Sequence, residues 1–162
     1  MNINAIKVYL KKLSHRPILQ TIHYENDEMM VCNTYSLIIE KSIVKTDQPF
    51  HIDVYTMQKT IGTYPDMSRI KPSNDILEEV YEVVALSSFE ENIYRINDHH
   101  FDKDLVNKTL KCIDLDLLKI DKQDLKVSFA HKLPYLVYET QRHYVLIIGI
   151  RKDEKWWKLY KL

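Results

Sequence analysis

The chain has 162 residues, 45% of them apolar and 28% charged, with 23 basic and 23 acidic side chains. These values are ordinary for one globular domain and exclude an intrinsically disordered chain. A chain of this length buries roughly 70% of its unfolded surface, so it needs neither a metal ion nor a disulfide to fold.

The first predicted element is a helix, because apolar residues recur at spacings of three and four from Ile3 to Leu13. Asn2 or Asn4 is placed to cap it, and the sequence SHRP ends it because the residue before a proline avoids helical backbone angles. Three lysines lie off the apolar stripe and are expected to face solvent: Lys7, Lys11 and Lys12.

Residues 18–64 are predicted to be β structure throughout. The strands are ILQTIHYE, one or two strands within MMVCNTYSLIIEKSIV, and FHIDVYTMQKTI, with polar turns between them. The stretch IGTYPDMSRIKP, residues 61–72, holds one of the two glycines and two of the five prolines. It closes the front half of the chain, residues 1–72.

An acidic connecting segment, residues 73–98, is predicted to hold short strands and to lead into the rear half, residues 99–152. A second helix is predicted within FDKDLVNKTLKCI, residues 101–113, with Asp102 as its cap and Lys108 and Lys111 on its exposed side. Four short strands are predicted after it: LLKID, DLKVSFA, LPYLVYET and HYVLIIGIR.

This order of helix, strands, turn, helix and strands predicts an α+β fold, with two helices packed on antiparallel sheets in a single compact domain, residues 1–162.

The charge is segregated along the chain. Residues 73–121 carry five basic and 12 acidic side chains, whereas residues 122–162 carry nine and four. A local basic face can therefore form, unless the acidic segment folds over it.

No pattern typical of a catalytic or metal site occurs. Two glycines do not make a phosphate-binding loop, and the adjacent pair His99 and His100 would point in different directions. We therefore expect a protein that is not an enzyme and has no cofactor or metal site. Cys32 and Cys112 lie in apolar segments without a CxxC partner, which indicates buried free thiols in a reducing compartment.

We expect a cytoplasmic protein without membrane segments, because no run of 18 apolar residues occurs and MNINAIKVYLKKL lacks the core of a signal peptide.

The basic, aromatic tail, residues 153–162, has two interpretations. Trp156, Trp157 and Tyr160 either contact a partner or another copy of the chain, or pack their rings on the body of the domain.

Four segments, in the same order, resemble the bacterial-type DNA sliding clamp and related phage proteins. RPILQTIHYENDEMMVCNTYSLIIEK resembles the clamp segment that contains RPIL and ends in TDGHRL. IGTYPDMSRIKP resembles DGRFPDYRRVLP, FDKDLVNKTLKCI resembles an inner helix, and LPYLVYETQRHYVLIIGIRK resembles the terminal strands that end in VMPMR. The similarity covers most of residues 3–152, and a full clamp subunit is more than twice as long.

The resemblance implies a reduced, clamp-like fold and a replication role of probable phage origin, in the cytoplasm of a host cell. Clamp helices line the hole of a ring and hold double-stranded DNA through lysine and arginine. The lysines that would do so here are Lys7, Lys11, Lys12, Lys108 and Lys111. A single-domain chain would have to assemble as several copies to encircle DNA.

Clamps also bind short peptides of polymerases in an apolar pocket. The resemblance places that pocket at the turn NTYSL and the strand IGIR, so that Leu37, Ile148 and Ile150 would supply its apolar side chains. Tyr35 and Ser36 stand where the family has histidine and arginine, and Gly149 replaces a proline. The alternative function is a clamp mimic that binds and inhibits a host replication or defence protein without binding DNA.

Overall fold

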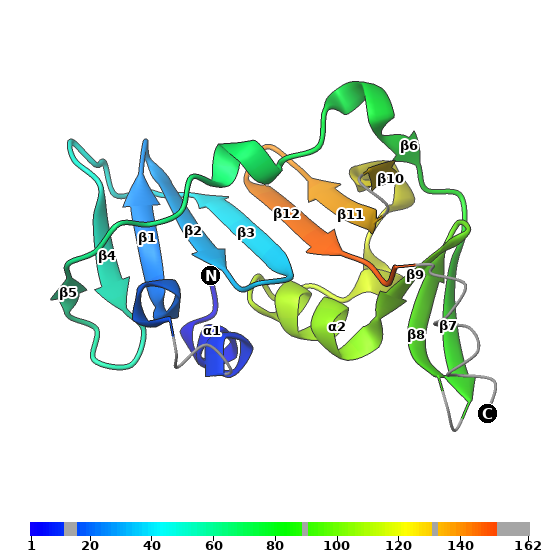
Figure 1. Ribbon diagram of the computed structural model, residues 1–162, viewed down its shortest axis with the longest axis horizontal. Helices are drawn as coiled ribbons and strands as arrows, with labels where there is room; N and C mark the ends of the chain where they lie inside the picture. The colour runs from blue at the N-terminus through cyan, green and yellow to red at the C-terminus, as the bar shows by residue number, and fades with distance from the viewer. Residues whose placement is uncertain (12–15, 89–90, 131–132, 152–162) are drawn as a thin grey trace.

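The computed structural model describes residues 1–11, 16–88, 91–130 and 133–151. In these ranges, two α-helices pack against a nine-stranded antiparallel sheet, and a three-stranded sheet stands at one end of it (Figure 1). The predicted α+β class is confirmed. The helices are α1 (Ile3–Leu10) and α2 (Lys103–Lys111), and the strands are β1 (Thr21–Glu25), β2 (Glu28–Cys32), β3 (Ser36–Lys41), β4 (Phe50–Asp53), β5 (Lys59–Thr60), β6 (Glu78–Glu79), β7 (Val83–Ser88), β8 (Glu91–Ile96), β9 (His99–Asp102), β10 (Leu125–Ala130), β11 (Leu133–Glu139) and β12 (His143–Ile148).

Both helices begin at capping residues that the sequence predicts. The Asn2 side chain accepts a hydrogen bond from the Ala5 N–H at 3.1 Å, and Asp102 accepts one from the Leu105 N–H at 2.8 Å. The second helix begins at Lys103 rather than at Phe101, because Phe101 lies in β9 and is fully buried there.

Six of the nine strands in the large sheet come from two units of a helix followed by three strands, and β4, β5 and β6 extend the sheet at its two edges. Its order is β5-β4-β1-β2-β3-β12-β11-β10-β6, so α1 precedes β1-β2-β3 and α2 precedes β10-β11-β12. In each unit the third strand lies at the centre, where β3 pairs with β12 through partners such as Ile38 and Val145. The repeated architecture expected from the sequence is therefore present, and α1 and α2 contact each other below the junction (Figure 1).

One of the four predicted rear strands is wrong. The sequence LLKID forms a 3-10 turn at Leu117–Lys119, because the Asp116 carboxylate accepts the Leu118 N–H at 3.0 Å and starts a turn there. Leu117 is buried by this turn and packs against the helix side of the sheet. Only the other three predicted strands are found, as β10, β11 and β12.

The centre of the sheet is buried on both faces. One face carries the larger core, which contains residues of both helices together with Val31, Ile38 and Val145. The opposite face carries Leu37, Ile39, Val137 and Leu146, and the chain crosses it between β5 and β6 (Figure 1). We call residues 61–77 the strap; its Met67 is 8% exposed and packs on this second cluster. The turn motif IGTYPDMSRIKP therefore covers a sheet face.

Gly149 lies where the two sheets approach each other closely. Its N–H donates to the Pro134 carbonyl at 2.7 Å, and the next N–H, of Ile150, donates to the His100 carbonyl at 2.8 Å. A Cβ atom at Gly149 would lie 2.5 Å from Pro134 Cγ and 2.7 Å from the His100 oxygen. This position therefore requires glycine.

In the part of the chain that the structure describes, neither helix has the length and apolarity needed to span a membrane.

Candidate functional site

The strongest candidate site is a groove of about 540 Å³ between the strap and the end of β12, which we call the strap groove. Four separate parts of the chain form it: the segment before β1, the turn after β2, the strap, and the strands β11 and β12. Ile70 and Ile76 of the strap are 44% and 40% exposed, so apolar surface is available there for a ligand. The apolar lining residues are Leu19, Cys32, Pro65, Met67, Ile70, Pro72, Ile76, Tyr135, Leu146 and Ile148.

The charged residues that line the strap groove are all basic: Arg16, Arg69 and Lys71. Arg69 contacts Asp66 of the strap at 3.2 Å, with both side chains largely exposed, and the Lys71 ammonium lies 4.4 Å from the centre of the Tyr144 ring. An exposed ion pair of this kind contributes little to stability. The groove therefore suits an extended segment that combines apolar side chains with an acidic one.

The turn at the end of the groove, Asn33–Ser36, is held rigidly by hydrogen bonds. The Asn33 carboxamide oxygen accepts the N–H groups of Tyr35 and Ser36, both at 2.8 Å. The Ser36 hydroxyl lies 2.7 Å from the Tyr9 hydroxyl of α1 and 3.0 Å from the Thr109 hydroxyl of α2. This buried network ties the turn to both helices, so the groove wall is preorganised before any ligand arrives.

A second groove of about 610 Å³ lies on the other side of the same turn, beside the two helices. We call it the helix groove. Val8 and Tyr35, which line it, are 58% and 60% exposed. Asn33, Thr34 and Ile148 line both grooves, so the turn and the end of β12 separate them.

The three predicted pocket residues occupy three different positions. Ile148 lines both grooves, and Ile150 lines only the helix groove. Leu37 lines neither; it is fully buried under the strap groove, in the cluster with Leu146 and Val137. The prediction that Leu37 contacts a partner directly is corrected, because its side chain points to the sheet core and pairs with Leu146 across the β3–β12 junction.

The predicted DNA-binding lysines lie on the outer sides of the helices. Lys108 and Lys111 are exposed on α2, Lys11 is exposed just after α1, and Lys7 is half-buried. Both helices that carry them pack on the same face of the sheet and contact each other. Asp104 is exposed on α2 as well, so this surface has mixed charge.

Two sets of predicted residues lie outside the described ranges. They are Lys12, and the tail residues Trp156, Trp157 and Tyr160.

The described cysteines are free and buried, as expected. Burial raises the pKa of the Cys32 thiol to about 11 and that of the Cys112 thiol to about 12, so both are protonated near neutral pH. In residues 1–11, 16–88, 91–130 and 133–151, no three histidine, cysteine, aspartate or glutamate side chains lie close enough together to hold a metal ion.

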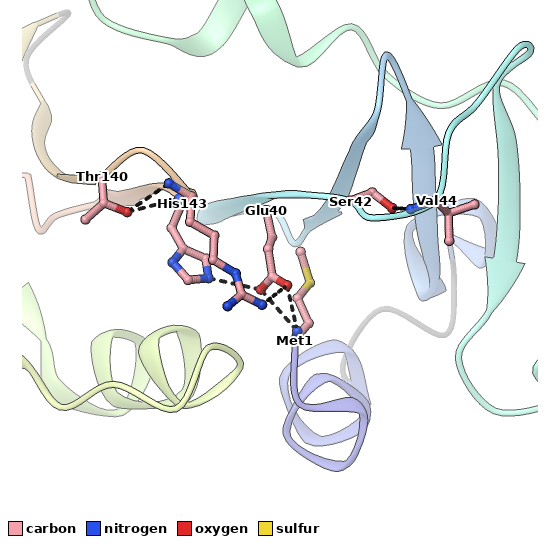
Figure 2. A network of polar contacts seen from close by, with 7 residues as sticks. Met1, Glu40, Ser42, Val44, Thr140 and His143 are labelled. Carbon is pink, nitrogen blue, oxygen red and sulfur yellow. Dashed lines mark hydrogen bonds and ion pairs between the residues drawn. The ribbon is translucent and has the colours of Figure 1, made fainter.

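A buried carboxylate stabilises the sheet junction beside the site. Glu40 of β3 is 3% exposed and accepts hydrogen bonds from the Met1 ammonium at 3.0 and 3.1 Å (Figure 2). Arg142 donates to it at 3.3 Å, and His143 lies 3.0 Å away. Burial by itself raises the pKa of Glu40, but the hydrogen bonds from Met1 and His143 outweigh this effect, so its pKa lies below the usual value of 4.5.

Sequence reasoning missed most of the groove-lining residues of the strap. Ile70 and Ile76 look like ordinary turn residues, and their exposure follows only from where the strap crosses the sheet. The stretch IGTYPDMSRIKP did contain a signal for a binding surface. Its two prolines restrict the backbone, and Met67 and Arg69 give it both apolar and charged side chains outside the strands, where binding residues are often found.

None of the family models, curated proteins and solved structures compared with this chain matches it.

Proposed function

We propose that this protein is a clamp-like replication accessory protein that binds a peptide segment of a partner protein in the strap groove. One observation carries the proposal. The two segments that the resemblance places at the clamp pocket, residues 33–37 and 148–151, are more than 100 positions apart in the chain, yet Asn33, Thr34, Ser36 and Ile148 of these segments line one groove with the strap. The two units of helix and three strands around a central β3–β12 pair are consistent with a reduced clamp-like fold.

The groove suits a peptide better than a small polar molecule. Its floor is apolar and its wall is held by the hydrogen bonds of the Asn33–Ser36 turn. Apolar pockets with a few fixed polar groups take apolar anchors, and a partner of opposite charge is favoured at a basic rim. Polymerase-type peptides and segments of host replication proteins both belong to this class.

A charge placed in the groove is expected to weaken peptide binding. Ile70→Glu puts a carboxylate on the exposed wall of the groove formed by the strap. An apolar side chain of the bound peptide would have to push this carboxylate aside or remove its water, and both cost free energy. We expect the affinity for a labelled clamp-binding peptide of a bacterial replicative polymerase to fall at least about tenfold in a fluorescence anisotropy titration, which is about 1.4 kcal/mol.

Ile43→Glu is the matched control, because Ile43 is fully exposed in the β3–β4 loop and lines neither groove. Equal affinities of the two variants, or no binding of the peptide by the wild-type chain, would contradict the assignment of the strap groove as its site.

The DNA part of the proposal rests on the lysines of the helices. We expect weak, salt-sensitive retention of double-stranded DNA by an assembly of several copies, measured by light scattering with and without DNA. Lys108→Glu with Lys111→Glu is expected to reduce retention and to lower the slope of log affinity against log salt by about two, because each lost phosphate contact removes about one unit.

The matched control reverses two exposed lysines, one at the end of β3 and one in the loop that follows it, Lys41→Glu with Lys45→Glu. If both double variants retain DNA equally, the helix surface is not the DNA site. If the wild-type chain is a monomer that ignores DNA but binds the peptide, the second candidate function is favoured: a clamp mimic that blocks a host protein. Asp104 beside the lysines favours this second candidate.

A further inference from the structure

Two buried histidines hold the start of the strap against the sheet. His23 of β1 and His51 of β4 are partners in the strand pairing and are 5% and 6% exposed. Their Nδ1 atoms lie 2.9 Å apart. His51 Nε2 lies 2.8 Å from the Gly62 carbonyl oxygen, and the Tyr64 ring stacks on the His23 ring with the centroids 4.5 Å apart. The histidine pair therefore contacts the strap through both Gly62 and Tyr64.

The hydrogen bonds of the pair fix how many protons it carries. The Gly62 carbonyl only accepts, so His51 Nε2 carries a proton. His23 Nε2 lies 3.0 Å from a Glu25 carboxylate oxygen, which accepts when ionised, so this nitrogen carries a proton too. A third proton lies between the two Nδ1 atoms, because one must donate and the other accept. Satisfying all three contacts as hydrogen bonds takes three protons on the four ring nitrogens, an arrangement whose one positive charge lies beside the Glu25 carboxylate.

A fourth proton does not fit this arrangement. It would place two N–H groups against each other across 2.9 Å and a second positive charge on two buried rings. The other ionisable groups at this place give no compensation. Burial raises the pKa of Tyr64 far above neutral and that of Cys32 to about 11, so both stay uncharged. Glu25 is the single carboxylate in direct contact with the pair among the described residues.

We propose that the histidine pair is a pH-sensitive switch that releases the strap from β1 and β4 when a fourth proton binds. His51 then turns away from His23 and gives up the Gly62 carbonyl, and Tyr64 loses its stacking partner. Since residues 65–76 of the strap form one wall of the strap groove, acidification weakens peptide binding there. This last consequence rests on the proposed function, whereas the release of the strap does not.

The size of the response follows from the proton count. Release takes up one proton, so the ratio of released to bound strap rises by up to about tenfold for each pH unit of acidification. The titration is therefore made across the range in which ordinary histidine side chains change charge, about pH 5 to pH 8.

The test is an NMR titration of the uniformly ¹⁵N-labelled chain from about pH 7.5 to about pH 5.5. The chain has two glycines, so the amide signals of Gly62 and Gly149 are readily assigned. We expect the Gly62 signal to shift with a single midpoint, while Gly149, at the junction of the two sheets, stays unchanged. We expect the histidine ring ¹⁵N signals at neutral pH to show one doubly protonated ring in the pair.

Two variants remove the fourth proton site without removing all hydrogen bonds. His51→Asn keeps an acceptor near the position of Nδ1, and His51→Gln keeps a donor that reaches Gly62. The Gly62 shift is expected to disappear in both. His99→Gln, in the smaller sheet, is the matched control and is expected to keep it. A Gly62 signal that ignores pH in the wild-type chain, or the same midpoint in both His51 variants, would overturn the switch.

A peptide titration at about pH 7.5 and about pH 5.5 separates this proposal from the proposed function. A Gly62 shift with affinity that falls on acidification supports both. A Gly62 shift without any peptide binding at either pH keeps the switch and contradicts the peptide site. Peptide binding of equal strength at both pH values, in a chain whose Gly62 signal does shift, overturns the link between the strap and the groove.

Discussion

Leu37→Asp is expected to prevent the chain from folding rather than to abolish partner binding alone. Leu37 has no exposed surface, and its neighbours across the strands are Cys32 and Leu146. The change removes a buried leucine, which costs about 2–5 kcal/mol, and adds a carboxylate with no partner. The expected total of at least about 5 kcal/mol is comparable to the whole stability of a domain. Circular dichroism during urea titration measures it.

Leu37→Met is the control, because it keeps the volume of the side chain and is expected to cost less than about 1.5 kcal/mol. A Leu37→Asp chain that folds normally and fails only in peptide capture would show that Leu37 lies at the groove surface, as the sequence resemblance predicted. The two views of this residue therefore give opposite results in one experiment.

The second large effect is expected at Glu40. Replacing it with alanine leaves the buried Met1 ammonium and the largely buried His143 without their carboxylate at the junction of β3 and β12, whereas Arg142, whose side chain is largely exposed, loses a surface contact. Breaking a buried ion pair by removing one partner costs about 3–5 kcal/mol. We expect a loss of this size in the free energy of unfolding, measured by urea denaturation near neutral pH. Glu139→Ala, at an exposed glutamate of β11, is the control and is expected to change it by less than about 0.5 kcal/mol.

The effect of Glu40 depends on pH in a defined direction. Its pKa in the folded chain lies below 4.5, so the stabilisation is fully present above pH 4.5 and is lost as pH falls through the folded value. The difference in stability between the wild-type chain and Glu40→Gln should therefore have its full value just above pH 4.5 and shrink below it. A difference that is unchanged by acidification would mean that the carboxylate is not the stabilising group.

The two grooves give the β2–β3 turn a central position. Asn33 and Thr34 line both grooves. The Asn33 N–H donates to the Tyr9 hydroxyl and the Ser36 hydroxyl is hydrogen-bonded to that of Thr109, which connects this turn to the helices that carry the exposed lysines. In the proposed clamp-like function, DNA on the helix side and a peptide on the strap side would meet across this one turn. The same geometry serves a mimic that uses only the strap side.

The sequence by itself determined the local elements. The spacing of apolar residues and the capping side chains of Asn2 and Asp102 fixed where the helices begin, because helices depend on neighbours three and four residues apart. Alternating and continuous apolar runs located most strands. The exceptions include LLKID, where Asp116 starts a 3-10 turn, and a local cap of this kind competes with strand formation. Residues 18–20, predicted as strand, lie in the 3-10 turn Pro17–Gln20, and residues 54–58 connect β4 to β5 without strand structure. Phe101 and Asp102, predicted with the second helix, lie in β9.

The tertiary structure alone decided which segments meet. The β3–β12 pair joins residues more than 100 positions apart, and a strand that is buried on both faces reads as one apolar run that does not tell which face each side chain takes. For this reason the sequence wrongly placed Leu37 at the groove surface. The exposure of Ile70 and Ile76 depends on where the strap crosses the sheet, and the contact of His23 with His51 depends on the pairing of β1 with β4. No local spacing of residues encodes either arrangement.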